Sequence, residues 1–180
     1  MNIHEITSTE ERERILSYLL QHQPKEINMN RIAKELGLSP GQIHKYINIL
    51  RRNRILGGTG ISDTPLVRVL RITDNIFKIE DSKLIQEIRK SIRDTKGIGM
   101  YGSWAEGTNT ETSDLDIWIK TEHEPEDIEL AKLRRKLEKK LGSKVDMIIL
   151  TKDRLSRLRE KSDSFYFSLY YSMTLWGERL

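Results

Sequence analysis

The most informative stretch of the chain is Met100-Tyr-Gly-Ser-Trp-Ala-Glu-Gly-Thr-Asn-Thr-Glu-Thr-Ser-Asp-Leu-Asp-Ile-Trp-Ile119. It contains an apolar run that ends at Gly102-Ser103, a polar loop, and a second apolar run that opens with Asp114-Leu115-Asp116. Because side chains alternate between the faces of a strand, both aspartates are expected on one face and Leu115 in a core. Two neighbouring carboxylates repel each other unless a cation lies between them or one is protonated. The pattern therefore favours a site for an oxygen-binding divalent cation such as Mg²⁺.

Gly102-Ser103 supplies a candidate anion site next to these carboxylates. A Gly at the end of a strand permits a sharp turn and the close approach of a ligand. Ser103 is expected to cap a short helix over residues 104–106, whose free amide groups can bind an anion. Asp-x-Asp alone is more often the polar tip of a strand. Its combination with Gly-Ser and two flanking apolar strands instead suggests chemistry on a metal-chelated nucleoside triphosphate.

The spacing of Gly102-Ser103, ten residues and Asp114-x-Asp116 resembles the signature of the DNA polymerase beta-like nucleotidyltransferases, in particular the minimal nucleotidyltransferases. The resemblance covers roughly residues 82–178. It implies a third metal-binding carboxylate on a later strand, and Asp146 in the apolar run 144–150 is the candidate. It also implies two Mg²⁺ ions, with Mn²⁺ as an alternative, and a nucleoside triphosphate substrate, expected to be ATP. The implied site residues are Asp114, Asp116 and Asp146 for metal binding and catalysis, and Gly102, Ser103 and Ser113 for nucleotide binding.

Trp118 departs from the family pattern, in which a smaller aliphatic residue is more usual. It is expected on the same strand face as Asp114 and Asp116. It either shapes the nucleotide pocket or covers the sheet, and the second interpretation is favoured.

Composition limits the class of protein. The 180 residues allow one ordinary domain or two small ones. Charged residues make up 32% and hydrophobic residues 37%, which predicts a soluble chain with modest cores. No apolar run is long enough to span a bilayer, and the N-terminus lacks the pattern of a secretory signal. The chain has no cysteine, so disulfides and Cys-ligated metals are excluded. These features fit a cytoplasmic protein without a membrane partner.

Residues 8–76 predict three helices followed by a β-hairpin. Ala33, Gly37 and Ile43 have the spacing of a helix-turn-helix, in which the small residue permits close helix approach and the Gly permits a tight turn. Two short apolar runs, 54–58 and 66–72, flank a polar loop and suggest the hairpin. Three helices plus a hairpin resemble the winged-helix family.

The winged-helix resemblance implies DNA binding through the third helix. The segment 31–72 contains eight basic and two acidic residues, which is typical of a polyanion-binding surface. Protein docking or dimerisation is the alternative, and a homodimer is one possible state because winged-helix proteins that read palindromes are commonly dimers. The expected DNA-binding residues are Pro40, Gln42, His44, Lys45, Asn48, Arg51, Arg52 and Arg54, the three arginines being placed to meet phosphates.

These patterns predict a two-domain α+β chain. A winged helix-turn-helix domain is expected over 1–76, and a connector with a linking helix over 77–96. A nucleotidyltransferase domain with a mixed β-sheet flanked by helices is expected over 97–180. Its predicted elements are a strand at 98–101, a helix at 122–141, a strand at 144–150 and a last strand at 173–176.

Two further segments each allow a structural and a functional interpretation. The basic face of the helix at 122–141 is more often solvated, although it could guide an RNA, DNA or triphosphate substrate. The aromatic segment 165–171 is more often core, although Tyr170 and Tyr171 could stack on a base. The four histidines have no ligand-like spacing and are expected to be structural or exposed.

Two functions remain open from the sequence. In the first, the chain is an enzyme that moves a nucleoside monophosphate onto a hydroxyl of a protein, RNA or small molecule. Minimal nucleotidyltransferases often act as antitoxins that modify a toxin, so the resemblance also implies a cognate toxin as a candidate acceptor and repression of the chain's own operon. In the second, the chain is a transcription regulator whose transferase-like domain only senses nucleotide. The intact acidic set and Gly102-Ser103 favour the enzyme.

Overall fold

The computed structural model describes residues 3–24, 26–58, 60–160 and 164–180. The chain forms two compact units, Met1–Arg71 and Ile72–Leu180. No helix of the described residues is both long and apolar enough to cross a membrane.

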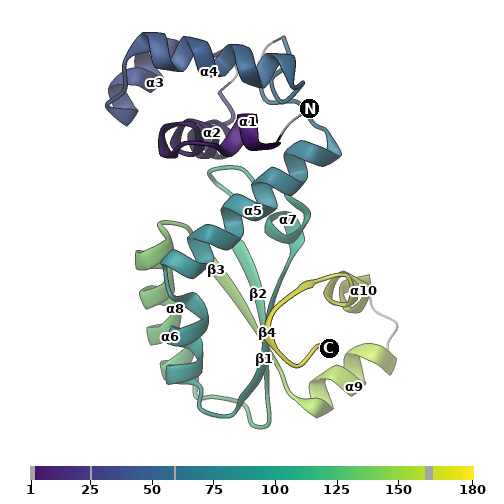
Figure 1. The fold of residues 1–180 in the computed structure, drawn as a ribbon. Helices are drawn as coiled ribbons and strands as arrows, with labels where there is room; N and C mark the ends of the chain where they lie inside the picture. The colour runs from purple at the N-terminus through teal and green to yellow at the C-terminus, as the bar shows by residue number, and fades with distance from the viewer. Residues whose placement is uncertain (1–2, 25, 59, 161–163) are drawn as a thin grey trace. The chain divides into compact units, whose positions relative to one another are not determined.

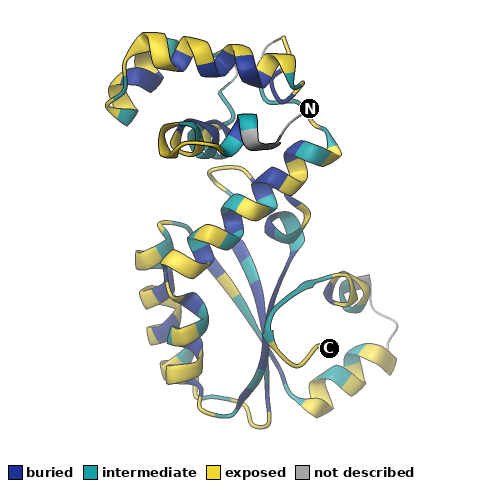
Figure 2. Cartoon of the chain, in the orientation of Figure 1, coloured by how far each residue is buried: buried dark blue, intermediate teal, exposed yellow. Residues whose placement is uncertain are grey.

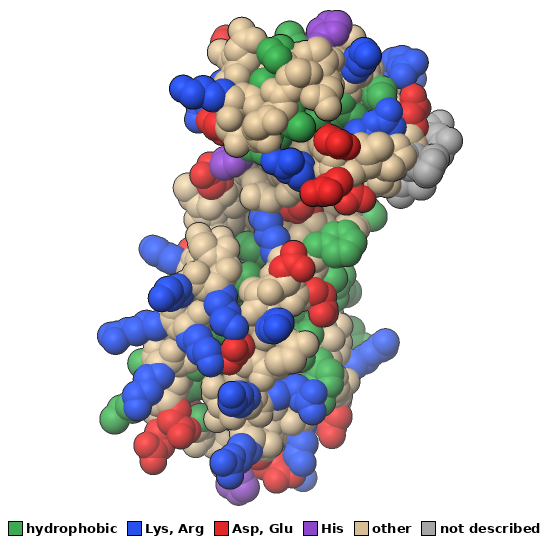
Figure 3. Space-filling view, turned by 60° about the vertical axis from the view of Figure 1, so that its left-hand side comes forward, with side chains coloured by type: hydrophobic (Ala, Val, Ile, Leu, Met, Phe, Trp, Pro, Cys, Tyr) green, Lys and Arg blue, Asp and Glu red, His purple; other side chains and the backbone are tan. Residues whose placement is uncertain are grey.

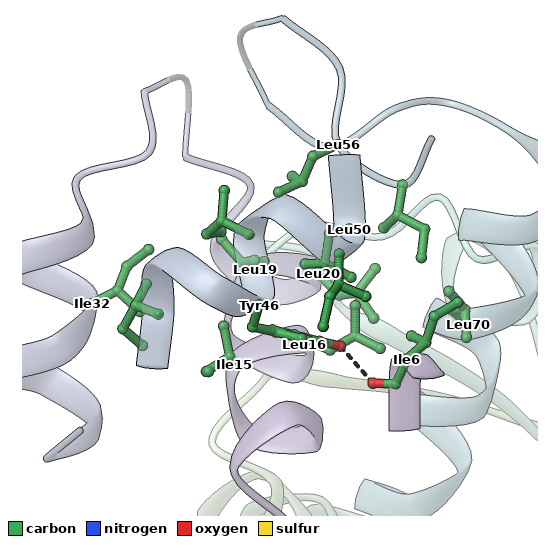
Figure 4. Close-up of a cluster of buried hydrophobic side chains, with 14 of the residues drawn as sticks. Ile6, Ile15, Leu16, Leu19, Leu20, Ile32, Tyr46, Leu50, Leu56 and Leu70 are labelled. Atoms are coloured by element: carbon green, nitrogen blue, oxygen red, sulfur yellow. Dashed lines mark hydrogen bonds between the residues drawn. The ribbon is translucent and has the colours of Figure 1, made fainter. Parts of the chain in front are cut away.

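The first unit is helical and has its own apolar core. The tyrosine hydroxyl of Tyr46 donates a 2.7 Å hydrogen bond to the carbonyl oxygen of Ile6, which satisfies a polar group inside this core (Figure 4). Burial raises the pKa of Tyr46, so this hydroxyl stays protonated and acts as a donor. The helices are α1 (Ile3–Thr7), α2 (Glu10–His22), α3 (Met29–Leu36), α4 (Pro40–Arg52) and the first part of α5 (Pro65–Asp81) (Figure 1).

The predicted helix-turn-helix is confirmed in α3 and α4. Gly37 ends α3 with a φ of 67°, and the Leu38 amide donates to the Ala33 carbonyl. Ala33 and Ile43 are buried, as the spacing predicted. Ser39 and Gln42 form a reciprocal capping box at the start of α4.

The predicted hairpin is wrong in its second strand, because residues 66–72 belong to α5. Val67, Leu70 and Arg71 are buried whereas the residues between them are exposed, which is a helical spacing. The Thr64 hydroxyl accepts a hydrogen bond from the Val67 amide, so Thr64-Pro65 is a helix start. Where the hairpin was predicted, an isolated antiparallel bridge pairs Leu56 with Ile61.

The second unit contains the predicted mixed sheet, flanked by helices (Figure 1). Its strand order is β3-β2-β1-β4, in which β1 pairs antiparallel with β2 and β4, and β2 pairs parallel with β3. The strands are β1 (Thr95–Tyr101), β2 (Leu115–Thr121), β3 (Val145–Leu150) and β4 (Met173–Gly177). The helices after α5 are α6 (Leu84–Ser91), α7 (Gly102–Glu106), α8 (Asp127–Leu141), α9 (Lys152–Glu160) and α10 (Ser164–Tyr170).

Each face of the sheet has a separate apolar cluster, as alternation along β2 requires. Leu115, Ile117 and Ile119 pack with residues of α6 and α8, and the end of α5 joins them through Ile79. The segment 77–96 thus contributes to this core. On the opposite face Trp118 packs with residues of α9 and α10. The strands of the sheet are largely buried, whereas the outer sides of α8 and α9 are exposed (Figure 2). The second face is the one that carries Asp116.

Two lysines of α8 bind one carboxylate of α6. Lys136 and Lys140 form ion pairs with Glu87, whose side chain is 14% exposed. Hydrogen bonds from both lysines lower the pKa of Glu87 to about 2, so it remains ionised. The presence of Lys136 and Lys140 on the basic face of α8 is therefore explained by their ion pairs with α6.

Trp118 covers the sheet, as predicted. It is fully buried, and its indole nitrogen donates a 2.8 Å hydrogen bond to the Ser172 hydroxyl. The ring lies directly over Gly99 of β1, where a Cβ would stand 2.3 Å from Cε2 of the indole. Gly99 is thus required by the indole that crosses it.

We predict that Gly99→Ala lowers the free energy of unfolding by about 1–3 kcal/mol, because the added methyl must displace the indole of Trp118, which is buried and hydrogen-bonded. Urea denaturation followed by far-UV circular dichroism measures the loss. In a Trp118→Phe background the smaller ring leaves room, so the cost of Gly99→Ala should shrink. An equal cost in both backgrounds would contradict this account.

Candidate active site

The sheet brings the predicted carboxylates to one place. Asp116 of β2 and Asp146 of β3 are direct partners in the parallel register, so their side chains lie on the same face. Asp114 precedes β2 by one residue and therefore shares the parity of Asp116. The amide of Leu115 donates to the carbonyl of Lys144 at 2.9 Å, which aligns the starts of the two strands.

The carboxylates influence one another electrostatically. The pKa of Asp116 is raised, first by burial and then by the charges of Asp146 and Asp114. Across the described part of the chain, no three acidic or histidine side chains are already gathered at metal-binding distances. A set of carboxylate oxygens that repel one another fits a hard divalent cation, which would relieve the repulsion.

Gly102 places the backbone turn against Asp116. Its φ is 63°, in the left-handed region, and a Cβ there would lie 2.5 Å from Oδ2 of Asp116. Any side chain at this position would displace the carboxylate. The Gly-Ser turn and the acidic pair, separated in sequence, are therefore neighbours in the fold.

Ser103 lies inside α7 and does not cap it. The position before the helix is Tyr101, which makes no capping hydrogen bond with its side chain, so the predicted role of Ser103 as a cap is wrong. Instead, the Ser103 carbonyl accepts the amides of Gly107, Thr108 and Asn109. Ser103 thus fixes the course of the loop that leads toward Asp114.

Ser113 closes the same loop. Its hydroxyl accepts a 2.9 Å hydrogen bond from the amide of Thr110, and its carbonyl accepts one from the indole of Trp104 at 3.4 Å. Its observed contacts hold the loop, and a contact with nucleotide stays a prediction.

Two side chains at the site were not predicted. Tyr101 is the antiparallel partner of Asp116, and burial together with the charges of Asp116 and Asp146 raises its pKa to about 12. Its ring meets Phe165 of α10 edge-on, with centroids 5.8 Å apart. Strand alternation before Gly102 could have found Tyr101. Arg134 reaches Asp146 at 3.9 Å from α8, a contact that no sequence spacing indicates.

Basic side chains gather over the second unit where α6 and α8 lie (Figure 3). Lys136 and Lys140 are engaged by Glu87, and Arg134 lies beside Asp146. The other basic residues on this face of α8 are exposed: Lys132, Arg135 and Lys139.

The aromatic segment divides between core and surface. Phe165 packs beside the buried Tyr101, as the core interpretation predicted. Tyr170 and Tyr171 are 66% and 82% exposed, so for them that interpretation is wrong. The side chain of His4 lies outside the described residues.

The predicted DNA-binding residues form an exposed stripe along α4 and just beyond it. Gln42 is engaged in the capping box, and Arg52 forms a 2.9 Å ion pair with Glu5. Arg54 follows the helix with a φ of 58°. The exposed residues are Pro40, Gln42, His44, Lys45, Asn48, Arg51, Arg52 and Arg54.

We predict that Asp116→Asn raises the melting temperature by a few degrees in metal-free buffer near neutral pH. Because the folded-state pKa of Asp116 exceeds its unfolded value, the ionised side chain costs stability above the folded pKa. This cost disappears as the pH falls below the unfolded value, so the two proteins should converge toward about pH 4. Calorimetry across this range measures the difference.

Asp153→Asn is the matched control, since it removes a carboxylate from the first turn of α9. That carboxylate favours the helix, so its loss should not raise the melting temperature. A lower melting temperature for Asp116→Asn than for wild type would refute the proposed cost of ionising Asp116.

Comparisons with known proteins agree with the predicted domains. Residues 82–170 match the family model of the nucleotidyltransferase domain, and residues 11–56 match that of a helix-turn-helix domain. Two proteins of Methanocaldococcus jannaschii, each named as a proposed protein adenylyltransferase, are similar to the chain. One is 36% identical over 74 residues, covering 38% of this chain and 74% of the relative. The other is 32% identical over 72 residues, covering 38% and 84%.

A solved toxin–antitoxin structure with AMP-PNP aligns with 58% of this chain and 74% of its own, at 27% identity and a TM-score of 0.43. The two family matches fall on the unit that holds the acidic residues and on the helices before it. The chain belongs to the nucleotidyltransferase family and carries an N-terminal helix-turn-helix domain.

Proposed function

We propose that the chain transfers a nucleoside monophosphate, with ATP as the donor, to a hydroxyl group of another molecule. The observation that carries this proposal is the position of Asp116, which lies beside Asp146 across the strand pair and against the backbone of Gly102. Two carboxylates beside a tight backbone turn support a site for a metal-bound triphosphate. The names of the archaeal relatives support ATP as donor and a protein as acceptor.

Asp114, Asp116 and Asp146 would hold the metal. Two Mg²⁺ ions, or Mn²⁺, would supply neutralisation of the triphosphate and of the oxygens that gain charge during transfer. Gly102 and Ser103 bind the β- and γ-phosphates, and Ser113 keeps the adjoining loop in place. The buried ring of Tyr101 excludes water from the side of Asp116 that faces β1.

The reaction is an in-line displacement. The acceptor oxygen forms a bond to the α-phosphorus, the bond between that phosphorus and the β-phosphate oxygen breaks, and pyrophosphate leaves. Asp146 orients the acceptor hydroxyl and takes its proton, a role that the exposure of its side chain supports. Positioning and charge neutralisation carry most of the rate in such chemistry.

The helix-turn-helix domain is proposed to bind DNA through α4. A cognate toxin as the acceptor and repression of the chain's own operon complete the proposal, on the strength of the resemblance to minimal nucleotidyltransferases.

We predict that Asp116→Asn lowers nucleotide transfer by at least about a hundredfold while the protein stays folded, because a metal ligand is lost. Incubation with labelled ATP, Mg²⁺ and cell extract measures transfer to macromolecules, and EDTA should abolish it in wild type. Asp153→Asn is the control that should keep full activity. Unchanged turnover in Asp116→Asn would remove the assignment, and nucleotide-sensitive DNA binding without any transfer would identify a regulator instead.

We predict that Lys45→Ala and Arg51→Ala each weaken binding to duplex DNA. Each loss should reduce the slope of log affinity against log salt concentration by about one, because a phosphate contact is removed. Fluorescence anisotropy over a salt series measures both quantities. Lys152→Ala, an exposed lysine of α9, is the control and should change neither. Identical salt slopes for all three variants would place the DNA-binding surface elsewhere.

A further inference from the structure

Two buried amide side chains join α5 to the loop between α7 and β2. Asn75 of α5 is 0% exposed and Asn109 of the loop is 4% exposed. Asn75 precedes the residues that match the nucleotidyltransferase family, and it belongs to neither the Gly-Ser turn nor the acidic set. The proposed mechanism gives it no role, so its burial needs a separate explanation.

The amide of Asn75 makes three hydrogen bonds. Its nitrogen donates to the carbonyl oxygen of Trp104 at 3.0 Å and to Oδ1 of Asn109 at 2.9 Å. Its own Oδ1 accepts from the amide nitrogen of Asn109 at 3.2 Å. One side chain therefore holds both α7 and the loop that follows it.

A second contact from α5 strengthens this attachment. The ammonium of Lys78, one turn after Asn75, lies 5.6 Å from the ring centroid of Trp104. The buried indole of Trp104 in turn donates to the carbonyl of Ser113. The contacts run from α5 through α7 to the residue immediately before Asp114.

Burying two amides is not the obvious way to stabilise a core. Apolar side chains of similar shape would stabilise it as well, whereas hydrogen-bonded amides fix the orientation of their partners. The partners here are the turn that begins at Gly102 and the loop that ends at Asp114. Their mutual placement determines whether the phosphate-binding turn and the first carboxylate face the same ligand.

We propose that Asn75 is a positioning residue for the nucleotide site, acting through Trp104 and Asn109 on the segment 102–114. This inference rests on the proposed function. Without the three hydrogen bonds α7 and the loop lose their common anchor, so nucleotide binding weakens even though every residue that touches the nucleotide is intact.

Asn75→Ala tests this inference. We predict that the KM for ATP and the dissociation constant of Mg-ATP rise about ten- to a hundredfold, with a smaller change in kcat. Asn109→Ala should have a weaker effect, since Asn75 still holds the Trp104 carbonyl. Ile79→Val removes one methylene from the same helix and the same core, so it is the control for lost stability. It should leave KM unchanged.

Hydrogen exchange separates this inference from the proposed function. The amides of residues 108–114 should exchange faster in Asn75→Ala than in Ile79→Val. If wild type binds and transfers nucleotide while Asn75→Ala binds it equally well, Asn75 has only a structural role and the inference is wrong. If wild type neither binds nor transfers nucleotide, the proposed function fails and this inference fails with it.

Discussion

The parallel pairing of β2 with β3 sets Asp116 directly beside Asp146, and the proposed chemistry of the second unit depends on that register. A slip of one residue would move one carboxylate to the opposite face of the sheet, among the apolar side chains that pack on α8. Two features hold the register: the hydrogen bond from Leu115 to Lys144 and the apolar residues that alternate with the acids. Parallel strands also require a crossover, which α8 supplies.

The same register has an energetic cost, because it holds carboxylates within reach of one another's charge. The pKa of Asp116 is raised first by burial and then by the charges of Asp146 and Asp114, so the register supplies part of this cost. The surrounding structure compensates with packing on both faces of the sheet, including the buried indole of Trp118 over Gly99 and the Glu87 ion pairs between α6 and α8. A carboxylate that is kept at a cost in stability is typical of proteins in which stability is given up for function.

Much of the second unit could be predicted because its signals are local. Alternation placed Asp114 and Asp116 on one face, and the short apolar runs located the strands that contain Asp146 and Trp176. The segment 66–72 was wrongly predicted as a strand because its apolar residues fit a strand as well as a helix. The helix start at Thr64-Pro65 was overlooked. Arg134 and Asn75 could not be predicted, since their contacts arise only when α8 and α5 pack.

The division between the two units falls inside α5, between Arg71 and Ile72. The family match begins later, at residue 82. A fragment that begins at residue 82 would lack Ile79, which belongs to its core, and Asn75, which is hydrogen-bonded to the carbonyl of Trp104. The smallest stable form of the second unit is therefore expected to be longer than the segment that matches the family, and truncation should stop before α5, at the polar residues that precede Pro65.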